Sequence, residues 1–224
     1  MQRRLQSGAD NRSSTRILIA SEARLWPVAT FTSLYLVVAL LVAVSRGNFE
    51  FLIYIAVMLI LIGVVWLLHR NVSLSSGVLW GLSIWGAAHM AGGLVTVPDS
   101  WPINGDIRVL YSWWIIPNLL KFDHIVHAYG FGIATWACWQ GLAAAIRRLG
   151  GDARPTGGLL ILSAAAGMGL GAMNELVEFA ATLLVPETNV GGYFNTGWDL
   201  VSNLVGVVIA VALIRVFSDS AKRA

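Results

Sequence analysis

The sequence predicts an all-α membrane protein, a polytopic bundle of six transmembrane helices. Of its 224 residues, 57% are apolar and only 12% are Asp, Glu, Lys or Arg, whereas soluble domains carry about 25% charged residues. The mean hydropathy is +0.70, and the apolar residues gather in runs near the length of about 20 residues that a membrane-spanning helix needs. Membrane strands are not expected, because the runs are too long and lack strict alternation.

Six apolar runs follow one another along the chain. We expect helices at 27–45, 51–68, 77–95, 123–146, 157–185 and 198–217. They form one membrane domain, 27–217, between polar tails at 1–26 and 218–224. The fifth run is the longest, so it tilts or begins in the headgroup region. The connection 96–122 carries Trp101, Tyr111 and Trp113, which predicts either a lid or an anchor in the membrane interface.

Basic residues orient this bundle. Twelve of the 15 Lys and Arg residues lie on the side that carries both termini, and three lie on the other side. The positive-inside rule then predicts that both termini are cytoplasmic. Because the basic residues lie between apolar runs rather than in one patch, we expect no nucleic acid among the partners.

Acidic residues and histidines occur inside four of the runs, and the predicted orientation places all of them in the outer half of the membrane. They are His89, Asp123, His124, His127, Glu175, Glu178 and Asp199, with Asn174 and Asn203 beside them. A charged side chain at the centre of a span costs roughly 2.5–3.5 kcal/mol on insertion scales, so such residues usually mark a buried polar site. The site-bearing spans are therefore 77–95, 123–146, 157–185 and 198–217.

The spacing of these residues favours a metal site. Asp123 and His127 are four residues apart and share a helix face, from which His124 is rotated away. Imidazole together with carboxylate suits Zn²⁺, Mn²⁺ or Fe²⁺. Glu175 and Glu178 lie one turn apart and repel each other unless a cation, a proton or a basic partner relieves them. No Lys or Arg lies within the runs at that depth, so we expect His, a metal or protons there.

Structural roles are the alternatives to this interpretation. Asp123 and Asp199 lie at the expected helix starts, where a carboxylate caps free N–H groups. Asn203 is also suited to a hydrogen bond with a neighbouring helix. The alternative for His89 is a core histidine whose hydrogen bonds are satisfied within the protein.

Four motifs follow one another through the site-bearing spans. They are HMAGG at 89–93, FDHIVHAYGF at 122–131, NELVEF at 174–179 and WD at 198–199. In order and spacing, the chain resembles the YjdF-like family of bacterial inner-membrane proteins over about residues 50–217. Its last span, with Asp199, Asn203 and Gly206, is also similar to the VanZ-like proteins. The resemblance implies a multi-pass protein of the bacterial cytoplasmic membrane, and the matching positions are His89, Asp123, His127, Glu175, Glu178 and Asp199.

The first functional hypothesis is a metal-dependent hydrolase or transferase that acts on a lipid or lipid-linked substrate. One divalent ion (Zn²⁺, Mn²⁺ or Fe²⁺) would be the cofactor, and membrane lipids would be the partners. The expected ligands are His89, His127, Glu175 and Asp199. Asp123 would orient His127, and Glu178 would act as the general base. His124, Asn174 and Asn203 would complete the polar surroundings.

Two other classes of function remain open from the sequence. One is a non-catalytic protein that binds a lipid or an antibiotic, as the VanZ-like resemblance implies. The other is a small proton- or cation-coupled transporter. The transporter is less favoured because secondary transporters usually place their site near the midplane, between broken helices.

Overall fold

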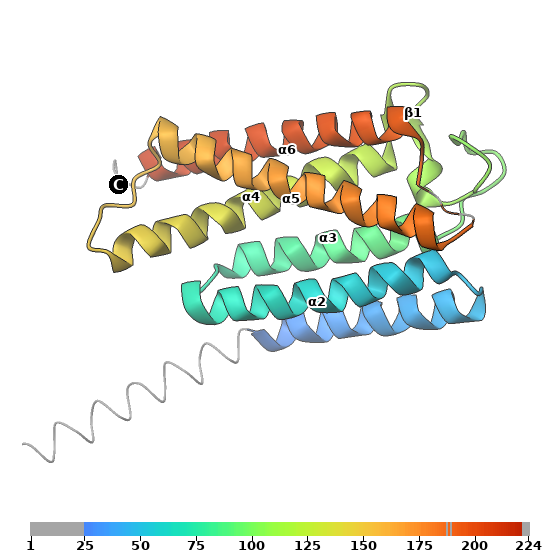
Figure 1. The fold of residues 1–224 in the computed structure, drawn as a ribbon, viewed down its shortest axis with the longest axis horizontal. Helices are drawn as coiled ribbons and strands as arrows, with labels where there is room; N and C mark the ends of the chain where they lie inside the picture. The colour runs from blue at the N-terminus through green and yellow to red at the C-terminus, as the bar shows by residue number, and fades with distance from the viewer. Residues whose placement is uncertain (1–24, 187, 189, 221–224) are drawn as a thin grey trace, which may run out of the picture.

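Long helices make up most of the protein in the computed structural model, which describes residues 25–186, 188 and 190–220 (Figure 1). They are the first helix (Leu25–Ser45), followed by α2 (Phe49–Val72), α3 (Ser76–Leu94), α4 (Phe122–Arg148), α5 (Gly157–Leu184) and α6 (Tyr193–Ser220). Every apolar run is therefore a helix, and the all-helical prediction is confirmed for this bundle. The predicted tails, 1–26 and 218–224, fall mostly outside the described residues.

Four of these helices are long and apolar enough to cross a membrane, as judged over the described part of the chain. They are the first helix, α2, α5 and α6. The other two, α3 and α4, have 19 and 27 residues but are not among these candidate spans. Their composition fits their position, because α4 packs against α3, α5 and α6 in the middle of the bundle (Figure 1). Polar side chains on α4 therefore face other helices.

Short polar connections define where several helices begin. The side chains of Asn48, Ser75 and Thr156 each accept a hydrogen bond from a backbone N–H in the first turn of α2, α3 and α5, respectively. Such N-caps satisfy donors that have no partner within the helix. Consecutive helices joined in this way run antiparallel, as Figure 1 shows.

Helices α4 and α6 approach each other closely at Gly206. A Cβ atom built on Gly206 would clash with the backbone carbonyl oxygen of Ala128 on α4. On α5, added Cβ atoms at Gly167 and Gly171 would meet the side chains of Thr135 and Asn203. Small residues thus let α4, α5 and α6 pack as one tight unit.

We expect Gly206→Ala to destabilise the protein, because the added methyl group meets backbone that cannot rotate away. Overpacking a core typically costs 1–3 kcal/mol, and we expect about 2 kcal/mol here. Gly63→Ala is the matched control, because a Cβ on Gly63 has no neighbour within 4 Å. Thermal unfolding in detergent should show a lower midpoint for Gly206→Ala alone. Equal midpoints for the two variants would contradict the close approach.

The connection between α3 and α4 folds over one end of the bundle. It contains η1 (Leu110–Ser112), β1 (Trp114–Ile116) and β2 (Leu120–Lys121), and the two strands pair antiparallel. Trp101 packs on Trp113 with ring centroids 4.3 Å apart. The role of this connection, residues 96–122, as a lid or an interfacial anchor stays a prediction. The pairing of β1 and β2 matters for the site because β2 leads directly into the first turn of α4.

Candidate functional site

A cluster of ionisable side chains lies where α4, α5 and α6 meet, beneath this folded connection. Asp123 and His127 come from the first two turns of α4, Glu175 and Glu178 from α5, and Asp199 from α6. All five are buried or half-buried, and Asp199 has no exposed surface. The structure therefore brings together five of the seven ionisable residues that the sequence singled out.

His127 is the centre of the cluster. Its Nδ1 lies 3.1 Å from the side-chain oxygen of Asn203 and 3.8 Å from Glu175 Oε1. Its Nε2 lies 3.6 Å from Asp123 Oδ1 and 4.0 Å from Glu178 Oε1. An amide oxygen only accepts hydrogen bonds, so Nδ1 donates to Asn203, and Nε2 is the ring nitrogen that faces the carboxylates of Asp123 and Glu178. A cation between them would satisfy both.

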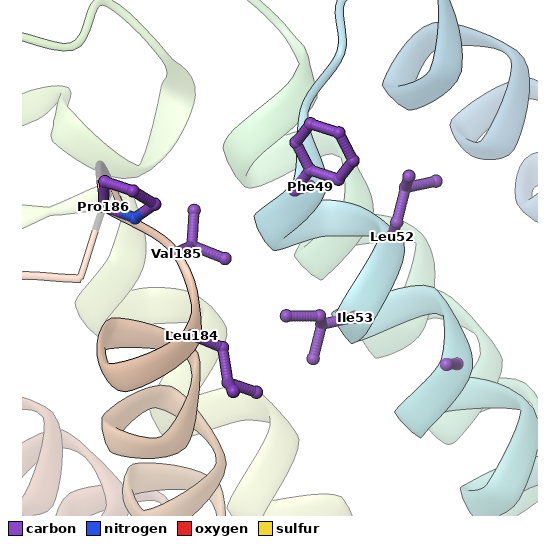
Figure 2. A pocket seen from close by; sticks show the side chains of 7 residues that line it. Phe49, Leu52, Ile53, Leu184, Val185 and Pro186 are labelled. Atoms are coloured by element: carbon purple, nitrogen blue, oxygen red, sulfur yellow. The ribbon is translucent and has the colours of Figure 1, made fainter.

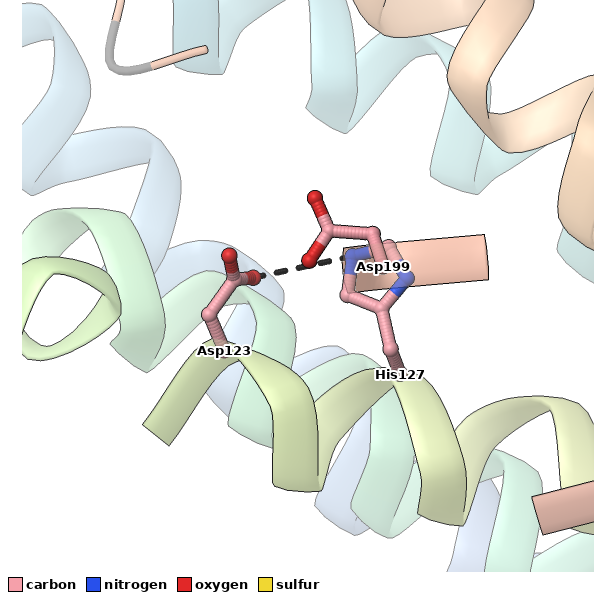
Figure 3. A group of neighbouring side chains, drawn as sticks. All are labelled: Asp123, His127 and Asp199. Atoms are coloured by element: carbon pink, nitrogen blue, oxygen red, sulfur yellow. Dashed lines mark ion pairs between the residues drawn. The ribbon is translucent and has the colours of Figure 1, made fainter. Parts of the chain in front are cut away.

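Two overlapping groups have the geometry of a metal site, among the residues that the structure describes. One consists of Asp123, His127 and Asp199, and the other of His127, Glu175 and Glu178. In each group, one ligand atom per residue lies within 4.8 Å of the others. Figure 3 shows the side chains of Asp123 and His127 on α4 converging with the carboxylate of Asp199.

Several carboxylate oxygens in the cluster have no hydrogen-bond partner within the described structure. They are both oxygens of Glu175 and Oδ1 of Asp199. Two other carboxylate oxygens have hydrogen-bond donors. Asp199 Oδ2 accepts from Asn195 Nδ2 at 2.5 Å, and Glu178 Oε1 accepts from Asn174 Nδ2 at 2.8 Å. Buried acceptors are nearly always paired in folded proteins, and a buried unpaired charge is costly. The open oxygens therefore mark a position suited to a cation.

Lys121 also belongs to the cluster, although the sequence analysis assigned it to an external connection. It is only 5% exposed, and its Nζ donates to Asp123 Oδ2 at 3.1 Å and to the side-chain oxygen of Asn195. No Lys or Arg lies within the predicted spans at this depth, but β2 brings Lys121 from just before α4 to Asp123, a basic partner that lies outside those spans. Its position two residues before Asp123 was the available signal.

The helix bounds bear on the alternative that Asp123 and Asp199 cap their helices. Because α6 begins at Tyr193, Asp199 lies in its second turn and does not cap it. Asp123 is in the first turn of α4, but its carboxylate pairs with Lys121. The expected contact of Asn203 with a neighbouring helix is confirmed by its hydrogen bond to His127.

His89 and His124 lie outside both groups. His89 Nδ1 is hydrogen-bonded to the phenol of Tyr111, and its ring packs near Phe51 and Tyr54. Burial raises the pKa of Tyr111, and the charge of Asp123 raises it further, so the phenol stays protonated and donates to His89. His89 therefore lies beside the cluster and not among its possible ligands.

His124 stabilises the start of α4. Its Nδ1 accepts from the backbone N–H of Lys121 at 3.3 Å. Its ring lies between Trp114 and Trp198, with centroid distances of 6.3 and 6.1 Å. This arrangement agrees with the prediction that His124 flanks the cluster.

A polar pocket of about 230 Å³ leads to the cluster from the end of the bundle. Lys121, Asp123 and Asn195 line it, together with Asn104 and Asp106 from the α3–α4 connection and Thr188 from the α5–α6 connection. A polar group entering here meets Lys121 and Asp123 directly.

Comparison with known proteins assigns the chain to a family. The family model described as "Predicted membrane protein (DUF2238)" matches residues 27–220. No curated protein and no solved structure matches the chain. The matched range includes α2 to α6 and with them the whole cluster.

Proposed function

We propose that this chain, which belongs to the DUF2238 family of predicted membrane proteins, is a metal-dependent hydrolase or transferase embedded in the bacterial cytoplasmic membrane. Its substrate is a lipid or a lipid-linked molecule. Both termini are cytoplasmic, so the cluster faces the outer leaflet. The distribution of Lys and Arg supports this orientation, and the resemblance to YjdF-like and VanZ-like proteins supports the location.

The observation that carries the proposal is the set of buried, unpaired carboxylate oxygens around His127. One divalent ion would be held by His127 with carboxylates drawn from both groups of potential ligands, those of Asp123, Asp199 and Glu175. Asn203 fixes the tautomer of His127, as outer partners of metal-binding histidines commonly do. Mixed imidazole and carboxylate ligands favour Zn²⁺, Mn²⁺ or Fe²⁺.

These ligands differ in one position from those expected from the sequence. His89 was expected to bind the ion, but its Nδ1 is engaged by Tyr111 and it belongs to neither group of potential ligands. Asp123 was expected to orient His127 from outside, and its approach to Nε2 supports a place among the ligands instead.

Glu178 is the general base in this proposal. A bound ion polarises the substrate oxygen and lowers the pKa of water. Glu178 would accept the proton of a water molecule as the water oxygen bonds to the substrate, and would return that proton to the substrate oxygen that leaves. In a transferase, an acceptor hydroxyl replaces the water. Asn174 holds Glu178 through its hydrogen bond to Oε1, which keeps the other oxygen available.

A protein that binds a lipid or an antibiotic without turnover is the alternative outcome of the same tests. A proton- or cation-coupled transporter is less supported. A transporter needs a polar route from the cluster to the far end of the bundle. Beyond the cluster, the buried polar side chains of α4 and α5 in the described chain are the hydroxyls of Thr135 and Ser163.

Elemental analysis by mass spectrometry of detergent-purified protein tests the ion. We expect about one transition-metal ion per chain in the wild type, and its loss in both Glu175→Gln and His127→Ala, because single ligands typically contribute tenfold or more to affinity. His69→Ala is the matched control, since this histidine lies in the last turn of α2 and should leave the ion bound. A wild type without metal, prepared without chelator, would contradict the metal site and favour the binder.

A further inference from the structure

An apolar groove lies at the same end of the bundle as the cluster. It has a volume of about 430 Å³ and lies between the first turns of α2 and the end of α5. Phe49, Leu52 and Ile53 line one side, and Leu184, Val185 and Pro186 line the other (Figure 2). Both helices are apolar enough to span a membrane, and Phe49 and Leu184, which line the groove, are exposed apolar side chains. An acyl chain is the occupant that this environment supplies.

The groove and the polar pocket adjoin the same connection. The segment between α5 and α6 contributes Pro186 to the groove and Thr188 and Val190 to the polar pocket. Along α5, Glu178 precedes Val185 by seven residues, which is about 10 Å of helix. The two cavities are thus joined by the α5–α6 connection, and the groove ends near the candidate base, an arrangement that suits one ligand with a polar end and an apolar end.

The chemistry of the polar pocket selects the kind of headgroup. Lys121 is a buried ammonium that lines the pocket, and ammonium groups bind phosphate as point charges. Asn104 and Thr188 add side-chain donors, and the acidic residues of the lining are Asp106 and Asp123, of which Asp123 is paired with Lys121. A divalent ion at the carboxylates would offset their charge and leave Lys121 available to an anion. Phosphate esters are also common substrates of metal-assisted hydrolysis.

We propose that the protein binds an amphiphile with a phosphate-bearing headgroup, which occupies the polar pocket at Lys121 while its acyl chain lies in the groove between α2 and α5. The inference rests on the proposed function, for which it names the substrate class.

Calorimetric titration of the detergent-solubilised full chain tests this inference. The probes are dioctanoyl phosphatidic acid, dioctanoylglycerol and inorganic phosphate, each also titrated into empty micelles. We expect phosphatidic acid to bind at least tenfold more tightly than either of the other two. Equal affinity for dioctanoylglycerol would contradict phosphate recognition, and equal affinity for inorganic phosphate would identify a free-phosphate site instead.

Two variants locate the two ends of the ligand. Ala56→Phe fills the groove from a position that lines it and should weaken phosphatidic acid binding at least tenfold, with inorganic phosphate unaffected. Leu59→Phe is its control, because Leu59 is on the same helix and 58% exposed. Lys121→Met is introduced into Asp123→Asn, so that Asp123 is not left without its counter-charge, and should weaken binding tenfold relative to Asp123→Asn alone. Unchanged affinity in either variant would contradict the corresponding half of the inference.

Metal content of the same samples separates the two proposals. Protein that lacks metal but binds phosphatidic acid as expected contradicts only the metal-dependent function. Protein that carries metal but does not distinguish the probes contradicts only the amphiphile site.

Discussion

Glu178→Gln is expected to lower the rate of substrate turnover by about 10²–10⁴-fold, the usual contribution of a positioned general base. The substitution keeps the shape of the side chain and an oxygen that accepts from Asn174, so the hydrogen bond of 2.8 Å can persist. An amide does not accept a proton as a carboxylate does. The ion should stay bound, because His127, Asp123, Asp199 and Glu175 are unchanged.

The measurement is phosphate release from dioctanoyl phosphatidic acid, with metal content determined on the same preparation. Asn174→Ala is the companion variant, since it removes only the contact that holds Glu178 and should cost less than Glu178→Gln. Loss of metal together with activity would make Glu178 a ligand. Full activity in Glu178→Gln would exclude it as the base, and a wild type that binds lipid without turnover would be a binder.

The sequence predicted the helices well because each depends on a local property, a run of apolar residues. The start of α6 was placed too late, at residue 198, because residues 193–197 include Asn195 and Gly197 and lack a hydropathy signal. Hydropathy identifies the part of a helix that meets lipid. It does not detect a helical turn that continues beyond that part, as α6 does.

Most of the cluster was also predictable, for a simple geometric reason. Antiparallel helices bring residues of equal depth together, so the depth of Asp123, His127, Glu175, Glu178 and Asp199 along their helices placed them at one end of the bundle. The four-residue spacing of Asp123 and His127 then predicted a shared face.

The partners supplied by the connections were not predictable in this way. Lys121 reaches Asp123 because β1 and β2 pair and turn the chain back onto the bundle. Tyr111 meets His89 through the same folded connection. Such pairings depend on tertiary structure, and neither hydropathy nor helical period contains them. This is why the sequence assigned His89 to the ion and Lys121 to a loop.

Lys121→Met is expected to destabilise the protein by about 3–5 kcal/mol, the cost of leaving one partner of a buried ion pair without its counter-charge. The Nζ–Oδ2 distance is 3.1 Å, and the side chains of Lys121 and Asp123 are only 6% and 12% exposed. Methionine has a similar length and no charge, so the loss reports on charge rather than on packing.

The double variant Lys121→Met/Asp123→Asn decides between the two explanations. If the cost arises from an uncompensated Asp123, removing both charges should restore more than half of the lost stability in denaturant unfolding. If the cost arises from packing, the double variant should be no more stable than Lys121→Met. Asp99→Asn is the control, because Asp99 pairs with Arg108 at the surface with its side chain fully exposed and should show no measurable change.

Addition of a transition metal to the same variants then connects stability to the site. An ion bound at Asp123 supplies the positive charge that Lys121→Met removes, so the metal should stabilise Lys121→Met more than it stabilises the wild type. Equal stabilisation of both would mean that the ion and Lys121 act on different carboxylates. In that case Asp123 would serve as the partner of Lys121 alone, and the ion would belong to His127, Glu175 and Glu178.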